Sequence, residues 1–197
     1  LFLQFKLKRY VPASFWSVVV LISIVGTLIT DRLVEEFGVN LVTTTIVFSI
    51  VLLVVFALWY INEETLSMHS INTAKRELFY WVAVLFTFAL GTATGDLLSE
   101  SLQWGYALSA LVFGAAIAMI AIAYYKFNLN GVLAFWLAYI LTRPLGASIG
   151  DLLSQSTKNG GFGYGTTGTS MLFLSIITGL VIYLSLKKKK RALPPID

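Results

Sequence analysis

Three aspartates and one arginine interrupt otherwise apolar stretches of this sequence. Asp31, Asp96 and Asp151 each end a six-residue block that begins with glycine, and the blocks read GTLITD, GTATGD and GASIGD. Arg143 lies eight positions before Asp151, next to Pro144. A charge near the centre of a bilayer costs at least about 2.5–3.5 kcal/mol, so it persists only with a partner, a water-filled cavity or a functional role. These four charged residues are therefore the first candidates for a functional site.

Carboxylates at the same position of three blocks indicate cation chemistry. A ring of carboxylates at the mouth of a pore raises the local cation concentration and replaces lost hydration oxygens. With no cysteine and one histidine, the chain offers hard oxygen ligands, which suit sodium, protons, magnesium, calcium or manganese better than copper. The alternative is structural, because an aspartate in the last turn of a helix also marks the water boundary or caps a loop. The sequence thus allows a bound cation, with Asp31, Asp96 and Asp151 as candidate metal ligands, and requires no cofactor.

Arg143 breaks the symmetry that the aspartates obey. The residue three positions before the block glycine is Ser23 in the first repeat, Phe88 in the second and Arg143 in the third. In the structural interpretation, its guanidinium binds carbonyls exposed by the adjacent proline, or joins helices through Thr27, Thr92 or a carboxylate. In the functional interpretation, it lines a polar cavity, where it binds an anion or exchanges partners during a transport cycle. Either way, we expect a hydroxyl, carbonyl or carboxylate partner from the first or second repeat.

The composition identifies the elements that must position these residues. With 57% hydrophobic residues, 12% charged residues and a mean hydropathy of +0.82, the chain has the composition of an all-α integral membrane protein. A span needs about 20 mostly apolar residues to cross about 30 Å of hydrocarbon. The predicted helices are 15–33, 41–60, 78–98, 107–127, 132–153 and 171–186. The remaining connections are too short for a further domain, so residues 1–197 form a single transmembrane domain.

An internal repeat relates these helices in pairs. Trp16, Trp81 and Trp136 each follow another aromatic residue and each lie ten residues before a block glycine. This register predicts three helical hairpins, at approximately 10–60, 75–127 and 130–186. Because each hairpin crosses the membrane twice, the repeats are parallel and the three aspartates face the same side. The tryptophans themselves are interpreted as packing or interface residues.

Small residues spaced one helical turn apart predict how the helices pack. The pairs are Gly26 with Thr30, Gly91 with Gly95, and Gly146 with Gly150. Such pairs let helix backbones approach closely in lipid, where packing drives association. We therefore predict an inner ring of the odd-numbered helices around an axis along the membrane normal. The even-numbered helices lie outside this ring.

The basic residues predict the orientation in the membrane. Eleven lysines and arginines fall on the side of the two termini, whereas Arg32 and Lys158 are the two on the opposite side. By the positive-inside rule, both termini are cytoplasmic. The KKKKR run begins a basic cytoplasmic tail, 187–197, that contacts anionic lipid. Nucleic acid is not an expected partner, and the oligomeric state stays open, a homo-oligomer included.

Several motifs together resemble a known family. The segments YVPASFW, FYW before GTATGD, and LTRPLGASIGDLL are similar to uncharacterised multi-pass bacterial inner-membrane proteins built from repeated helix hairpins, described generically as membrane-anchored proteins. The resemblance covers nearly the whole chain and implies a location in the bacterial inner membrane. It also implies one further hairpin before Tyr10, so that the present chain lacks the first hairpin and LFLQFKLKRY is the tail of it. The family supplies no activity to transfer.

Two classes of function remain. The sequence shows neither a serine–histidine arrangement nor a histidine-rich cluster, which argues against an enzyme that acts on lipid. One hypothesis is a transporter or channel for a small solute or cation, including a divalent metal, that uses the three aspartates and Arg143. The other is a membrane scaffold or accessory subunit in which these charges are structural. A water-filled cavity that reaches Arg143 would favour transport.

Overall fold

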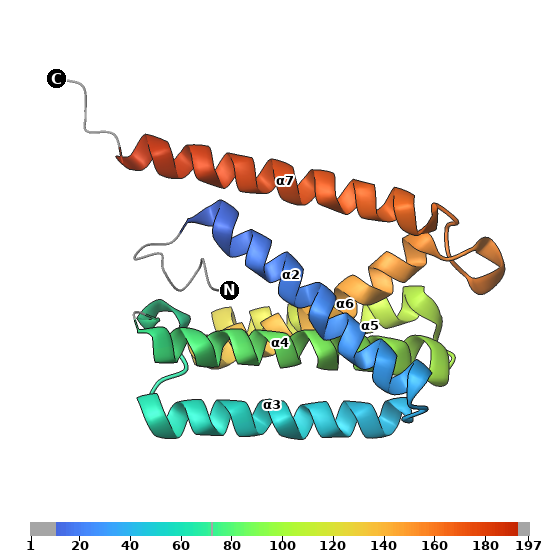
Figure 1. Cartoon of the computed structure of the whole chain (residues 1–197), viewed down its shortest axis with the longest axis horizontal. Helices are drawn as coiled ribbons and strands as arrows, with labels where there is room; N and C mark the ends of the chain where they lie inside the picture. Colours follow the sequence, from blue (N-terminus) through green and yellow to red (C-terminus); the bar gives the residue numbers. More distant parts are fainter. Residues whose placement is uncertain (1–10, 72, 193–197) are drawn as a thin grey trace.

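The chain folds as a bundle of helices. The computed structural model describes residues 11–71 and 73–192, and side chains as far as Lys187. The helices are α2 Pro12–Asp31, α3 Leu41–Glu63, α4 Ala74–Asp96, α5 Gly105–Phe127, α6 Gly131–Ser154 and α7 Gly165–Ala192 (Figure 1). All six are long and apolar enough to cross a membrane, and the described part of the chain contains no strand. The prediction of a six-helix multi-pass membrane protein is confirmed.

Two predictions fall on residues that are not described. The segment LFLQFKLKRY, interpreted as the tail of a preceding hairpin, lies in residues 1–10, outside the described residues. Most of the basic tail also lies outside them, because the side chains of 188–192 and all of 193–197 are not described. Both expectations therefore stay predictions.

Capping residues explain where several helices begin. The side chains of Asn40 and Asn130 accept hydrogen bonds from the backbone of Val42 at 2.7 Å and Val132 at 3.0 Å, respectively. Thr73 caps α4 in the same way. These side chains satisfy donors that a helix leaves free in its first turn. At the start of α2, Pro12 occupies the first turn, where its missing N–H removes no helix bond.

The aspartate blocks of the first two repeats end in the same local structure. Asp31 and Asp96 are the last α-helical residues of α2 and α4, and each is followed by a π-helical turn, η1 Arg32–Glu36 and η3 Leu97–Ser101. In the third repeat α6 continues to Ser154 without such a turn. π-Helical turns are rare and cluster at functional sites. The first two aspartates thus share a backbone setting that the third lacks.

The three repeats are parallel. The helices α2, α4 and α6 run in one direction and α3, α5 and α7 run in the opposite one (Figure 1). The bundle therefore has an aspartate end, where the three blocks terminate, and a tryptophan end, where α2, α4 and α6 begin. The aspartate end carries Asp31, Asp96 and Asp151, and the tryptophan end carries Trp16, Trp81 and Trp136.

Each repeat packs mainly on the next repeat. The helix α3 lies against α4, and α5 lies against α6, so the second helix of each hairpin packs on the first helix of the following hairpin. The hairpins are consequently interlocked rather than self-contained. The central helix is α4, in which 61% of the most apolar stretch is buried, against 6% in α7.

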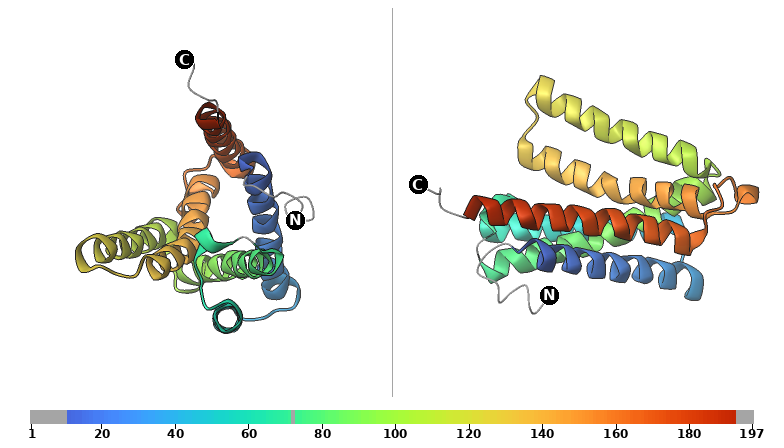
Figure 2. Two further views of the ribbon diagram at one scale, coloured as in Figure 1. Left: turned by 90° about the vertical axis from the view of Figure 1, so that its left-hand side faces the viewer. Right: turned by 90° about the horizontal axis from the view of Figure 1, so that it is seen from above.

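The inner layer of odd-numbered hairpin helices is an open arc. The helix α4 packs against α2 on one side and α6 on the other, whereas α2 and α6 are not packed together (Figure 2). The helix α7 lies beyond the open side of this arc and touches both α6 and α2. The predicted inner layer is therefore present, but α2, α4 and α6 do not close into a ring by themselves, because α2 and α6 each contact α7 rather than each other.

The repeated aromatic residues gather at the tryptophan end. The rings of Phe15 and Trp81 lie 5.4 Å apart between centroids, those of Tyr80 and Trp136 lie 6.1 Å apart, and those of Trp59 and Trp136 lie 5.8 Å apart. The indole of Trp136 also donates a hydrogen bond of 2.9 Å to the backbone oxygen of Leu66. Aromatic pairs at these distances add to the burial energy of a core. This cluster holds the starts of the three inner helices together and is a packing element.

Candidate functional site

The first joint between repeats connects α2 and α4. A Cβ atom added to Gly26 would lie 2.6 Å from Cβ of Phe88 and 3.1 Å from the backbone nitrogen of Ala89, so only glycine fits. One turn later, the buried hydroxyl of Thr30 donates a 2.9 Å hydrogen bond to the backbone oxygen of Ala89. Close backbone approach and hydrogen bonds across helices are the two contacts that stabilise membrane bundles.

The second joint, between α4 and α6, repeats this arrangement. A Cβ atom on Gly91 would overlap Cβ of Arg143 and would lie 3.2 Å from Cδ of Pro144. A Cβ atom on Gly95 would lie 3.3 Å from Cβ of Ala147 and 3.7 Å from Cα of Pro144. The face of α4 formed by Gly91 and Gly95 is therefore filled by α6.

Both joints use the same register. The block glycine meets the residue three positions before the next block glycine, which is Phe88 for Gly26 and Arg143 for Gly91. The fifth block residue meets the residue two positions before the next block glycine, as Thr30 meets Ala89. Gly95 meets Pro144 in the same way. A single contact rule thus relates the first repeat to the second and the second to the third.

The third block glycine has no such contact. A Cβ atom added to Gly146 or to Gly150 would meet nothing within 4 Å outside its own helix. Gly146 is exposed. Of the five glycines predicted to pack helices, three do so here and these two do not.

Arg143 has an aromatic partner. The carbon Cζ of its guanidinium lies 3.4 Å from the centroid of the Phe88 ring, and its Nε is buried without a hydrogen-bond partner in the described part of the chain. The predicted hydroxyl, carbonyl or carboxylate partner is therefore wrong in chemical type, although the partner does come from the second repeat. Gly91 draws the backbone of α6 so close to α4 that the guanidinium lies over the ring, where a cation–π contact replaces a hydrogen bond.

Thr27 and Thr92 bind each other instead of Arg143. Their hydroxyl oxygens lie 3.2 Å apart, and Thr92 also bonds to the backbone oxygen of Phe88 at 3.2 Å. Both residues follow the block glycine directly, and the third repeat has Ala147 at this place. These two candidate site residues are therefore part of the first joint between repeats.

The three aspartates lie at one end without forming a common site. Asp96 is close enough to both Asp31 and Asp151 for electrostatic interaction. No ion pair within the described residues includes any of the three. No group of three or more His, Cys, Asp or Glu side chains in the described ranges could hold a metal ion. The expected three-carboxylate metal site is thus not assembled, because α2 and α6 lie on opposite sides of α4 and separate Asp31 from Asp151.

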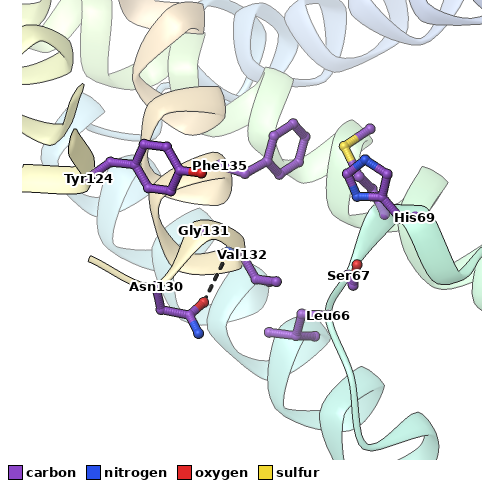
Figure 3. Close-up of a pocket in the computed structure, with 9 residues that line it drawn as sticks. Leu66, Ser67, His69, Tyr124, Asn130, Gly131, Val132 and Phe135 are labelled. Atoms are coloured by element: carbon purple, nitrogen blue, oxygen red, sulfur yellow. Dashed lines mark hydrogen bonds between the residues drawn. The ribbon is translucent and has the colours of Figure 1, made fainter. Parts of the chain in front are cut away.

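A cavity with mixed apolar and polar walls lies at the tryptophan end. It has a volume of about 340 Å³ and lies between residues 66–69 and the adjoining ends of α5 and α6. Figure 3 shows Tyr124, Asn130 and Phe135 on one side, with Leu66, Ser67 and His69 across from them. None of the four charged candidates lines it. Sequence patterns did not indicate this cavity, because it forms where residues 66–69 meet the adjoining ends of α5 and α6, segments that are distant in sequence.

Comparison with known proteins identifies the repeat. Residues 14–65, 79–129 and 134–190 each match one family, described as Repeat of Unknown Function (DUF347). No curated protein and no solved structure matches the chain. The three matched segments follow the three hairpins and together cover most of the sequence. The resemblance to an uncharacterised repeat family is therefore confirmed, and the chain belongs to the family defined by this repeat of unknown function.

Proposed function

We propose that this chain forms a transport path for a small cationic solute or metal cation. The observation that carries the proposal is that Asp31, Asp96, Asp151 and Arg143 all lie on the three inner helices without an ion-pair partner in the described part of the chain. A charge within a membrane is costly, and charges kept there mark ion and substrate pathways. The excess of basic residues near the termini supports an outward-facing aspartate end.

The three aspartates act as an acidic entrance. Their mutual repulsion is relieved when a cation approaches, so the aspartate end concentrates cations from the adjacent water. Asp96 contributes most, because it lies between the other two carboxylates and interacts with both. This role needs no chelate, since an entrance raises the local concentration without holding the ion tightly.

Arg143 is the second functional residue on the proposed path and lies deeper in the bundle than the aspartates. It lies about 12 Å from Asp151 along α6, at a rise of 1.5 Å per residue. Its guanidinium is held by the face of Phe88 rather than by an anion, so it is able to change partners without breaking an ion pair. Passage of the solute therefore requires Arg143 to exchange partners, so that loss of its guanidinium interrupts the path.

A scaffold is the second candidate function. It is favoured by the observation that Cβ of Arg143 forms part of the joint with Gly91. In that case Arg143 joins α4 to α6, and the aspartates mark the end of the helices.

Flux through reconstituted protein distinguishes the two functions. Purified protein in liposomes is tested for passage of sodium, manganese and choline, with protein-free liposomes as the baseline. We expect Asp96→Asn to lower cation flux about fivefold, which corresponds to about 1 kcal/mol of charge interaction. The matched control is Glu36→Gln, an exposed carboxylate at the same end that pairs with Arg32 at 3.6 Å, and we expect it to keep wild-type flux. Wild-type protein that passes none of the three cations would contradict transport and leave the scaffold.

A further inference from the structure

Two buried serine hydroxyls lack the hydrogen bond that other buried hydroxyls make. Ser109 on α5 is 0% exposed and Ser148 on α6 is 1% exposed, and neither hydroxyl oxygen has a partner in the described part of the chain. Hydroxyls inside a helix often donate to the backbone oxygen four residues earlier, as those of Thr87 and Ser99 do at 2.8 Å. A buried hydroxyl without a partner costs free energy. Ser109 and Ser148 are therefore candidates to contact a ligand between the helices.

The two hydroxyls lie in the same layer of the bundle. A Cβ atom added to Gly114 on α5 would lie 4.0 Å from Cδ1 of Leu145 on α6, so these two residues lie opposite each other. The helices α5 and α6 are antiparallel (Figure 1). From this contact, Ser109 is five residues and Ser148 is three residues toward the aspartate end. At a rise of 1.5 Å per residue, their levels along the helix axes differ by about 3 Å.

Ser148 faces the junction of α4 with α5. It lies four residues after Pro144, which contacts α4, and three residues after Leu145, which contacts α5. Residues three and four apart share a helix face, so Ser148 stands between these two lines of contact and is buried by both neighbours. The second repeat has Ala93 at the same block position. Packing between repeats therefore needs no hydroxyl at this place.

A phenol and two carboxylates continue the polar cluster toward the end of the helices. Tyr106 lies three residues before Ser109 on α5, and Asp151 lies three residues after Ser148 on α6, so each pair shares a helix face. The Tyr106 side chain lies next to Glu100 of η3 and close enough to Asp151 for electrostatic interaction. Glu100 and Asp151 also interact electrostatically. These two carboxylates repel each other unless a cation lies between them.

We propose a sodium-binding site at the junction of η3, α5 and α6, formed by the side chains of Glu100, Tyr106, Ser109, Ser148 and Asp151. All five offer oxygen ligands, which suit a hard cation, and the serine hydroxyls replace water that the ion loses on entry. A divalent metal fits less well, because no group of three acidic or histidine side chains within the described ranges could hold one. The site deepens the proposed function and rests on it, since the acidic entrance supplies the cation.

Equilibrium binding of radioactive sodium to the purified protein in detergent tests the site without transport. We expect wild-type protein to bind sodium that unlabelled sodium displaces and choline does not. Ser109→Ala and Ser148→Ala should each raise the Kd about tenfold, because each removes one hydroxyl from the bound charge. The matched control is Ser99→Ala, which removes a buried hydroxyl that already donates to the backbone oxygen of Gly95, and it should keep the wild-type Kd.

Thermal unfolding separates the site from a structural role of the serines. Without sodium, Ser109→Ala and Ser148→Ala should unfold at or above the wild-type temperature, because each removes a buried hydroxyl that has no partner. Sodium should raise the unfolding temperature of wild-type protein more than that of either variant.

Three results would overturn the sodium site: no sodium binding by wild-type protein, serine variants that bind like wild type, or an equal loss in Ser99→Ala. The failure of transport is a different result. Wild-type protein that binds sodium but passes no cation in liposomes would refute transport alone. Cation flux through protein that binds no sodium would refute this site alone.

Discussion

Gly91 and Gly146 open the same six-residue block in neighbouring repeats, yet their surroundings differ completely. Gly91 is buried against Arg143 and Pro144, whereas Gly146 has nothing near the position of a Cβ atom. Both helix surfaces lack side chains at the same two positions, because the second and third blocks each have glycine at their first and fifth positions. Whether such a surface is filled depends on the next inner helix along the arc. The motif therefore specifies an ability to pack, and the neighbour decides whether packing occurs.

The largest effect is expected when a methyl group is added at Gly91, in the close contact between α4 and α6. Gly91→Ala should destabilise the protein by about 3 kcal/mol, since the new methyl group overlaps Cβ of Arg143, which cannot move without shifting α6. The free energy of unfolding is measured by denaturant titration in detergent micelles. Wild-type stability for Gly91→Ala would contradict the close contact between α4 and α6.

The second largest effect is expected at Arg143, whose guanidinium lies over the Phe88 ring in the joint between α4 and α6. A double-mutant cycle with Phe88→Leu and Arg143→Leu should show a coupling of about 1–2 kcal/mol, because a guanidinium over a ring in a dry environment gains a cation–π interaction. Arg143→Lys keeps the charge but loses the planar group. We expect Arg143→Lys and Arg143→Leu both to reduce cation flux in liposomes, with near-normal membrane insertion of the lysine variant. Additive single substitutions would remove Phe88 as the partner, and full flux through Arg143→Leu would remove Arg143 from the path.

A smaller effect is expected from the hydroxyl pair of the first joint. Thr27→Val and Thr92→Val replace hydroxyls 3.2 Å apart by groups of similar shape. Their coupling in a double-mutant cycle should be about 0.6 kcal/mol, as for other hydrogen bonds between membrane helices. Thr94→Val is a suitable control, because its hydroxyl bonds within α4 to Leu90 at 2.7 Å. If the coupling between Thr27 and Thr94 equals that between Thr27 and Thr92, the hydrogen bond between Thr27 and Thr92 does not specifically stabilise the first joint.

The smallest effect is expected at the open site. Gly146→Ala should not destabilise the protein, because the methyl group meets no neighbour, and the helix preference of alanine over glycine should stabilise it by at most about 0.5–1 kcal/mol. The free energy of unfolding is again measured by denaturant titration in detergent micelles. A loss as large as that of Gly91→Ala would mean that another element covers Gly146, and the contrast between the two glycines would disappear.

The sequence by itself determined the membrane class, the six helices, the three repeats and the common end of the three aspartates. These features follow from local properties: the length of apolar runs sets the spans, and the fixed register from tryptophan to aspartate sets the repeat. It also indicated which glycines can pack, since small residues one turn apart lie on one helix face.

Only the tertiary structure decided which of these faces meet. Sequence periodicity places Gly91, Gly95, Gly146 and Gly150 on similar surfaces, but contact depends on which helix lies against each surface. The same holds for Arg143, whose need for a partner is evident from its depth, while the choice of the Phe88 ring depends on the approach of two backbones. The interlocking of outer helices with the following repeat, and the open arc between α6 and α2, likewise arise from packing between segments distant in sequence. Such contacts depend on side-chain shape in three dimensions, which a repeat register does not encode.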